Sequence, residues 1–154
     1  MGVMKAWLQR VKRGSVSIDG RTVAETGPGY VVLLGVRRDD TSEDALYLAD
    51  RTVSLRIFPD SDGKMNLSIE DVAGEIMVVS QFTLHADTRK GNRPSFIDAA
   101  DPVLAERLYE EYVAALRRAL GEGRVATGVF RADMLVEILN DGPVSIELKS
   151  RREL

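Results

Sequence analysis

The sequence predicts an α+β fold, a mainly antiparallel, barrel-like β-sheet with two main helices, on three observations. Short apolar segments recur between Gly, Pro and Asp turn signals, which is typical of strands. Only two stretches carry apolar residues at helical spacing. The length of 154 residues suits one domain with its own core. We therefore expect one domain over residues 1–154, with residues 1–3 as an extension before a start at Met4 and residues 150–154 as a charged tail.

Strands are expected at the start of the chain. Residues 6–11 read as a strand, and residues 16–24 alternate around Asp19-Gly20. Asp-Gly tolerates the positive φ angles of a tight turn, so a hairpin is predicted there. The continuous apolar run over residues 30–36 predicts a strand buried on both faces.

Two helices and further strands follow. The acidic segment 39–44 caps a helix that continues through Thr52, and Asp101-Pro102 begins a longer helix that Gly121 ends. Between and after the helices we expect a long loop over residues 85–98, turns over residues 59–63 and 140–145, and strands over residues 55–58, 75–81, 124–130, 134–139 and 144–148.

Composition excludes several classes of chemistry. The chain has no cysteine and a single histidine, His85, which excludes disulfides, thiolate metal sites, a cysteine nucleophile and a three-histidine metal site within one chain. A net charge of −3 argues against a protein that binds long duplex DNA. No apolar run approaches the roughly 20 residues that cross a bilayer, and no secretory signal is visible. We expect a cytoplasmic protein with no membrane or DNA partner, and no metal or cofactor.

The segment Ser80-Gln81-Phe82-Thr83-Leu84 places polar residues at the end of a buried strand. Strand ends hold side chains rigidly, and the following loop exposes backbone N–H groups. Thr83 could act as a nucleophile, because His85 would lie on the same face two residues further along a strand. The spacing alone favours the simpler interpretation, in which the hydroxyls cap backbone groups.

Two other segments are candidates for a site. The sequence Asn140-Asp141-Gly142-Pro143 has the composition of a turn, and its Gly-Pro bond can be cis or trans. An ordinary hairpin explains it equally well. The loop around Arg89, Lys90 and Arg93 carries three cations that suit phosphate contacts, although a solvated loop explains it too.

Together, these segments resemble the D-aminoacyl-tRNA deacylase family. The resemblance rests on residues 80–84 followed by 86–91 and 93–96, and on Asn140-Asp141-Gly142-Pro143 in the position of a family motif. It covers nearly the whole chain. Ser145 stands where the family motif usually has Thr, which keeps the hydroxyl and removes a methyl group. Further matches occur in order at 9–11, 34–36, 64–67 and 127–130.

The resemblance implies an editing hydrolase that cleaves the ester of D-aminoacyl-tRNA at the 3′-terminal adenosine, and also that of glycyl-tRNA mischarged on tRNA-Ala. It implies a homodimer with shared active sites. The Gly142-Pro143 bond is expected to be cis and to enter the site of the partner subunit. There its carbonyls would hold the substrate amino group, and its backbone would exclude an L side chain. Asn140 and Ser145 belong to the same substrate-binding motif.

The resemblance also assigns Ser80, Gln81, Phe82 and Thr83 to the ester and the adenosine. Backbone N–H groups of Gln81 or Phe82 would stabilise the oxyanion. Thr83 would either attack or position the substrate, and the family favours positioning, with the tRNA 2′-hydroxyl helping to activate water.

Four basic residues outside the two motifs are also assigned roles, and two alternative functions remain open. Arg10 is expected to brace the Gly-Pro segment, and Arg89, Lys90 and Arg93 to contact tRNA phosphates. One rival is a small-molecule esterase or amidase with Thr83 as nucleophile. The other is a tRNA-end or nucleotide-binding module without catalysis.

Overall fold

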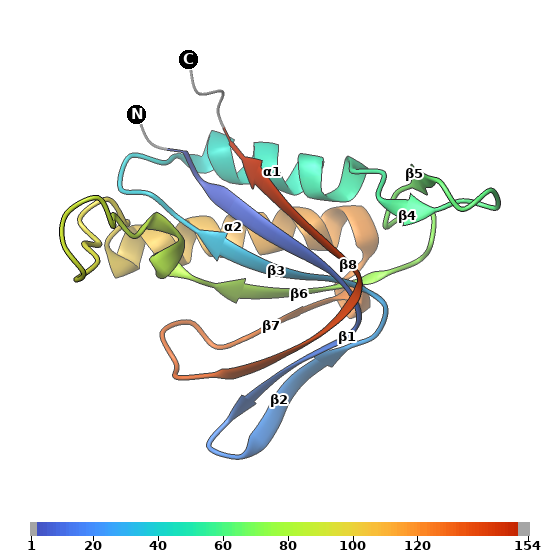
Figure 1. The fold of residues 1–154 in the computed structure, drawn as a ribbon, viewed down its shortest axis with the longest axis horizontal. Coiled ribbons are helices and arrows are strands. Elements are labelled where there is room, and N and C mark those ends of the chain that lie inside the picture. The colour runs from blue at the N-terminus through green and yellow to red at the C-terminus, as the bar shows by residue number, and fades with distance from the viewer. Residues whose placement is uncertain (1–2, 151–154) are drawn as a thin grey trace.

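A computed structural model describes residues 3–150 and shows a curled β-sheet covered on one face by two long helices (Figure 1). A six-stranded sheet has the order β2-β1-β3-β6-β7, with β8 paired to β1, and β4 and β5 form a separate two-stranded ribbon. The strands are β1 (Lys5–Ile18), β2 (Arg21–Thr26), β3 (Gly29–Gly35), β4 (Phe58–Pro59), β5 (Met65–Leu67), β6 (Glu75–Ser80), β7 (Val125–Thr127) and β8 (Leu135–Lys149).

The long strand β1 organises the sheet. Its first half pairs with β3, its second half pairs with β2, and β8 pairs along its other edge, all antiparallel. The pairs β3–β6 and β6–β7 are parallel. The predicted barrel-like, mainly antiparallel sheet is confirmed. Among residues 3–150 no ladder joins β7 to β8, so hydrogen bonding does not close the barrel at that point.

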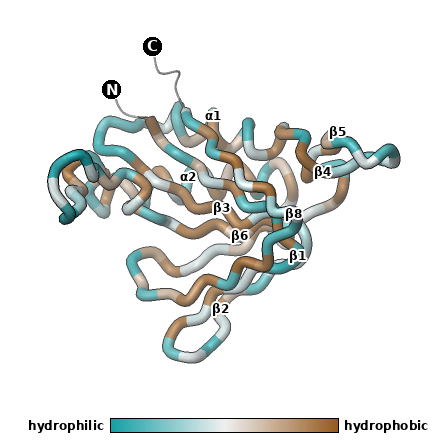
Figure 2. Tube along the Cα trace, viewed as in Figure 1, coloured by the Kyte–Doolittle hydropathy of each residue, from teal (hydrophilic) through white to brown (hydrophobic). Residues whose placement is uncertain are grey.

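The helices α1 (Ser42–Ser54) and α2 (Pro102–Leu120) pack on one face of the sheet (Figure 1). The main core lies between helices and sheet, and the buried hydroxyls of Thr52 and Tyr112 are hydrogen-bonded to each other at 2.8 Å across it. Brown, hydrophobic stretches follow the central strands β3 and β6 in Figure 2. A smaller core of Val11, Val16, Val31, Met77 and Val79 fills the curled half of the sheet.

Several predicted boundaries are confirmed at the level of single contacts. The Asp101 carboxylate accepts hydrogen bonds from the N–H groups of Val103 at 3.0 Å and Leu104 at 3.1 Å, so it caps α2. The β1–β2 hairpin turns at Asp19 and Gly20, whose φ angles are 51° and 78°. Such positive angles explain the Asp-Gly sequence at the turn.

The prediction of a turn over residues 140–145 between two strands is wrong. These residues lie inside the single strand β8. The register of β8 against β1 shifts on both sides of Val11, so the strand bends there instead of turning back. Among the described residues β8 pairs only with β1, and an edge strand with an irregular register can accommodate a proline.

Two other predicted strands are shorter in the structure. Residues 55–57 are not a strand, because the Leu55 N–H donates to the Arg51 carbonyl at 3.1 Å and ends α1. Arg124 belongs to a 3₁₀ turn (Glu122–Arg124) before β7, and β7 ends at Thr127.

The predicted extension and tail fall largely on residues 1, 2 and 151–154, outside the described residues. Ser150 does not belong to a tail. It is 7% exposed, its Oγ accepts a hydrogen bond from the Met4 N–H at 3.0 Å, and its N–H donates to the Met4 carbonyl at 3.0 Å. Over residues 3–150, neither helix is both long and apolar enough to span a membrane.

Candidate active site

The chain turns sharply where β6 ends at Ser80. The Gln81 N–H donates to the Leu34 carbonyl at 2.8 Å, which holds the corner against β3, and residues Phe82–His85 form a 3₁₀ turn. The predicted strand through Gln81 therefore stops one residue earlier. A 3₁₀ turn does not place side chains at i and i+2 on one face, so the structure separates Thr83 from His85.

His85 cannot serve as the base for Thr83 in this arrangement. Its ring is buried, with Nε2 2.9 Å from the Gly35 carbonyl oxygen, whereas Thr83 is exposed. Burial lowers the pKa of His85 and favours the neutral ring. The Thr83 hydroxyl instead accepts a hydrogen bond from the side-chain amide of Gln81. That contact positions the hydroxyl without activating it for attack.

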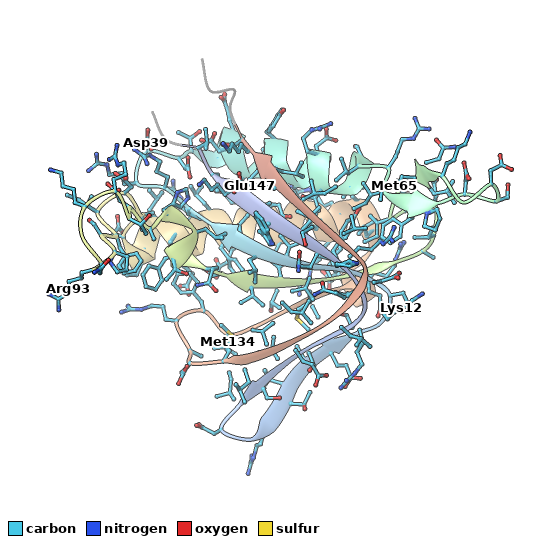
Figure 3. All side chains as sticks on the ribbon, viewed as in Figure 1. Lys12, Asp39, Met65, Arg93, Met134 and Glu147 are labelled. Atoms are coloured by element: carbon cyan, nitrogen blue, oxygen red, sulfur yellow. The ribbon has the colours of Figure 1, made fainter. Side chains whose placement is uncertain are left out.

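A cavity of about 560 Å³ opens beside this corner. Ser80, Gln81 and Phe82 line it together with Phe96 from the long loop and Arg131 from the β7–β8 loop. Figure 3 labels Met134 at the end of the β7–β8 loop, and Met134 also lines the cavity. Further lining residues come from the start of α2 (Pro102 and Ala105) and from the β7–β8 loop (Phe130 and Asp133).

Two aromatic side chains at the cavity are unusually exposed. Phe82 is 55% exposed and Phe96 is 38% exposed, and their ring centroids lie 5.0 Å apart in an edge-to-face arrangement. Exposed aromatic faces beside a cavity suit the stacking of a flat ligand such as a nucleobase.

Only one of the two expected oxyanion donors is free. The Gln81 N–H is already bonded to Leu34, whereas the Phe82 N–H makes no hydrogen bond to any residue of the 3–150 range. Of the two alternatives, Gln81 or Phe82, the N–H of Phe82 is therefore the one that remains a candidate oxyanion donor.

The second motif lies at the bend of β8. The Gly142–Pro143 peptide bond is cis, and Gly142 has a φ of 128°. Asn140, Gly142, Pro143 and Ser145 are all exposed. The predicted bracing by Arg10 corresponds to specific contacts. Its Nε donates to the Asp141 carbonyl at 3.1 Å, and its Nη1 donates to the Ile57 carbonyl at 2.6 Å.

A single chain does not bring the two motifs together. Ser80 pairs with Leu34 and Leu34 with Ala6, whereas the bend lies at Arg10, further along β1. The separation along the strand alone is about 13 Å at roughly 3.3 Å per residue. None of residues 140–145 lines the cavity.

The three predicted phosphate-binding cations differ in their surroundings. The Arg89 guanidinium binds both oxygens of Asp87, at 2.9 and 2.8 Å, and lowers the pKa of that carboxyl to about 2. Lys90 and Arg93 are exposed and bind no other side chain in the described part of the chain. Figure 3 shows Arg93 pointing outward from the loop.

Sequence reasoning missed the α2 and β7–β8 contributions to the cavity. For the β7–β8 loop, the one available signal was the match of Gly128-x-Phe130 to the family sequence. Over the range that the structure describes, no cluster of three or more His, Asp or Glu side chains could hold a metal ion.

This chain is similar over nearly its whole length to proteins named as deacylases. The family model of D-Tyr-tRNA(Tyr) deacylase matches residues 7–149. A D-aminoacyl-tRNA deacylase of Dehalococcoides mccartyi strain CBDB1 is 57% identical over 152 residues, which covers 98% of this chain and 97% of the relative. A D-aminoacyl-tRNA deacylase of Anaeromyxobacter dehalogenans is 56% identical over 150 residues, 97% of this chain and 99% of the relative.

Solved structures share the fold. The c-Myc DNA Unwinding Element Binding Protein has a TM-score of 0.91 at 40% identity and covers 96% of this chain and 99% of its own. A probable eukaryotic D-amino acid tRNA deacylase has a TM-score of 0.83 at 19% identity, covers 96% of this chain and 100% of its own, and matches in fold. The curated relatives are named as deacylases, which are hydrolases, and the match of this chain to their family makes it an enzyme of that class. The chain belongs to the D-Tyr-tRNA(Tyr) deacylase family.

Proposed function

We propose that the protein hydrolyses the ester that joins a D-amino acid to the 3′-terminal adenosine of tRNA. The observation that carries the proposal is the cavity after β6. Ser80, Gln81 and Phe82 line it, and the backbone N–H of Phe82 has no hydrogen-bond partner within residues 3–150. The family membership supports it, because the relatives of 56–57% identity are named D-aminoacyl-tRNA deacylases.

The terminal adenosine would stack on the Phe82–Phe96 pair. These rings present exposed faces at the cavity, and base–aromatic stacking is the usual way in which proteins hold an unpaired base. The same placement brings the ribose and its ester toward Ser80 and Thr83.

Hydrolysis then needs little from the protein. A water oxygen attacks the ester carbonyl, the carbon–oxygen bond to the ribose breaks, and the ribose oxygen takes up a proton. The Phe82 N–H stabilises the oxyanion, and Thr83, held by the Gln81 amide, positions the ester. His85 is buried away from Thr83, which supports water activation by the tRNA 2′-hydroxyl in place of a side-chain base.

Chiral selection would come from a second subunit. Gly142 and Pro143 are exposed at the bend and lie far from the cavity of their own chain, which supports a homodimer in which each bend enters the cavity of the other subunit. Their carbonyls would bind the substrate ammonium, and their backbone would leave no room for an L side chain. Glycine has no side chain to exclude, so glycyl-tRNA would also be a substrate. Asn140, held by Gln9 through a 3.1 Å hydrogen bond, and Ser145 would support the bend.

The remaining partners follow from charge. Lys90 and Arg93 would contact tRNA phosphates, with Arg89 joining them when it releases Asp87. The net charge of −3 opposes general DNA binding. A cytoplasmic location would suit an enzyme that acts on aminoacyl-tRNA.

The first test is a deacylation time course with matched D-Tyr-tRNA and L-Tyr-tRNA, with an enzyme-free control. We expect release from the D form alone. Equal release from both forms would contradict the chiral filter. If tyrosine is released from neither tRNA but a non-hydrolysable aminoacyl-adenosine binds, the protein is a binding module without catalysis. Sedimentation of the same sample tests the dimer.

A further inference from the structure

The loop between β7 and β8 carries an arginine in a conformation that arginine rarely adopts. The Ala132 N–H donates to the Val129 carbonyl at 3.1 Å and closes a four-residue turn. Arg131 is the third residue of this turn and has a φ of 66°. Turns with a positive φ at the third position normally have glycine there, because a side chain is disfavoured.

The Arg131 side chain is not used to hold the fold together. It is exposed, and within residues 3–150 it forms neither an ion pair nor a side-chain hydrogen bond. It lines the cavity that contains Ser80 and Phe82. A residue in an unfavourable backbone conformation with a free charge at a cavity suggests a functional role.

We infer that Arg131 binds the 5′-phosphate of the terminal adenosine, an inference that rests on the proposed function. An adenosine whose base stacks on Phe82 and Phe96 carries this phosphate on the far side of its ribose, at the mouth of the cavity. A guanidinium matches two phosphate oxygens at once. Asp133, exposed on the same lining, repels the phosphate, so the attraction at this rim comes from Arg131.

This contact is distinct from the one proposed for the long loop. Lys90 and Arg93 are exposed and do not line the cavity, so more distant tRNA phosphates would reach them. Arg131 would act on the single phosphate nearest the ester, and so would help to set where the ester lies.

The test compares two small substrates, 3′-O-(D-tyrosyl)adenosine and its 5′-phosphate. We expect the wild-type protein to favour the phosphorylated substrate by about tenfold in kcat/KM. Arg131→Gly should reduce this preference to less than about twofold. Arg131→Lys should give an intermediate value, because lysine keeps the charge but lacks the planar guanidinium that can bind two phosphate oxygens. Glycine suits the backbone at this turn, so Arg131→Gly is expected to fold, which thermal unfolding will check.

Arg51→Ala is the matched control, because Arg51 is an exposed arginine of α1 that does not line the cavity. It removes the same charge and should keep the wild-type preference. The inference is overturned if Arg131→Gly keeps that preference, if Arg51→Ala removes it equally, or if the wild type shows none. Hydrolysis of neither substrate nor of D-Tyr-tRNA would overturn the proposed function, and this inference with it.

Discussion

The corner after β6 and the bend of β8 use their polar groups in different ways. At the corner, the Phe82 N–H and the rings of Phe82 and Phe96 are left open toward a cavity. At the bend, the Asp141 carbonyl is held by Arg10 and the Asn140 amide by Gln9, while Gly142 and Pro143 project outward. The corner therefore leaves its groups open toward the cavity, whereas the bend fixes its own polar groups by hydrogen bonds to β1 and leaves Gly142 and Pro143 exposed.

Changing the bend at Gly142 should have the largest effect. In Gly142→Ala the new Cβ would lie 2.9 Å from Val144 Cγ2 and 3.1 Å from the Val144 nitrogen, at a φ of +128°. The bend must shift, and we expect kcat/KM for D-Tyr-tRNA to fall about 100-fold, as misplacement by about 1 Å can cause. Steady-state kinetics will measure this.

Gly20→Ala is the matched control for that substitution. Gly20 also has a positive φ, 78°, but its new Cβ would meet nothing within 4 Å. It should cost about 1 kcal/mol in unfolding free energy and leave kcat/KM unchanged. Equal activity of the two variants would show that the bend plays no part in the reaction.

Arg10→Ala should have the next largest effect. It removes the donors to Asp141 and Ile57 from a side chain that is only 11% exposed, and we expect a loss of about 30-fold in kcat/KM with a smaller preference for D over L substrate. Lys12 also approaches Asp141, at 3.5 Å, but is 65% exposed, so Lys12→Ala should change activity less than about twofold. An unchanged D-over-L preference in Arg10→Ala would argue against the positioning role.

At the corner, Thr83→Ala should have a smaller effect. A positioning hydroxyl contributes about tenfold to kcat, whereas loss of a true nucleophile costs about 10⁴-fold or more. Thr83→Ser keeps the hydroxyl and should recover most of the activity. Single-turnover deacylation separates these outcomes, and a loss near 10⁴-fold would favour the rival reading of Thr83 as nucleophile.

His85 should affect stability but not chemistry. Burial lowers the pKa of the folded form, and the hydrogen bond to the Gly35 carbonyl opposes this shift. Lys5 and Arg37 lower the pKa further, while Asp98 raises it. Below the ordinary pKa of 6.5 the unfolded chain binds a proton that the folded chain does not, so the unfolding free energy falls as the pH falls. The slope from one group is at most about 1.4 kcal/mol per pH unit.

Urea unfolding at pH 7.5 and 5.5 will measure this dependence. His85→Gln retains a donor toward the Gly35 carbonyl and should show a smaller loss between the two pH values. An identical loss in the wild type and the variant would assign the dependence to carboxyl groups instead.

The comparison also explains what the sequence could and could not predict. Local signals located the hairpin at Asp19-Gly20 and the ends of α2, because each depends on a few neighbouring residues. The sequence predicts a turn at Gly142-Pro143, because the continuation of the strand there depends on pairing with β1, more than a hundred residues away. The sequence does not indicate a role for Arg131, because that role depends on a φ angle and on a cavity formed by segments far apart in the chain.

The pairing of β1 on both edges restricts how this gene can change in length. Residues Lys5 to Val11 are matched to β3 on one side, and residues Lys5 to Gln9 are also matched to β8 on the other. Inserting one codon between Leu8 and Arg10 would turn the following side chains to the opposite face, so Arg10 could no longer reach the Asp141 carbonyl. Relatives that keep the bend should therefore vary in length at the β1–β2 and β4–β5 tips rather than within this strand.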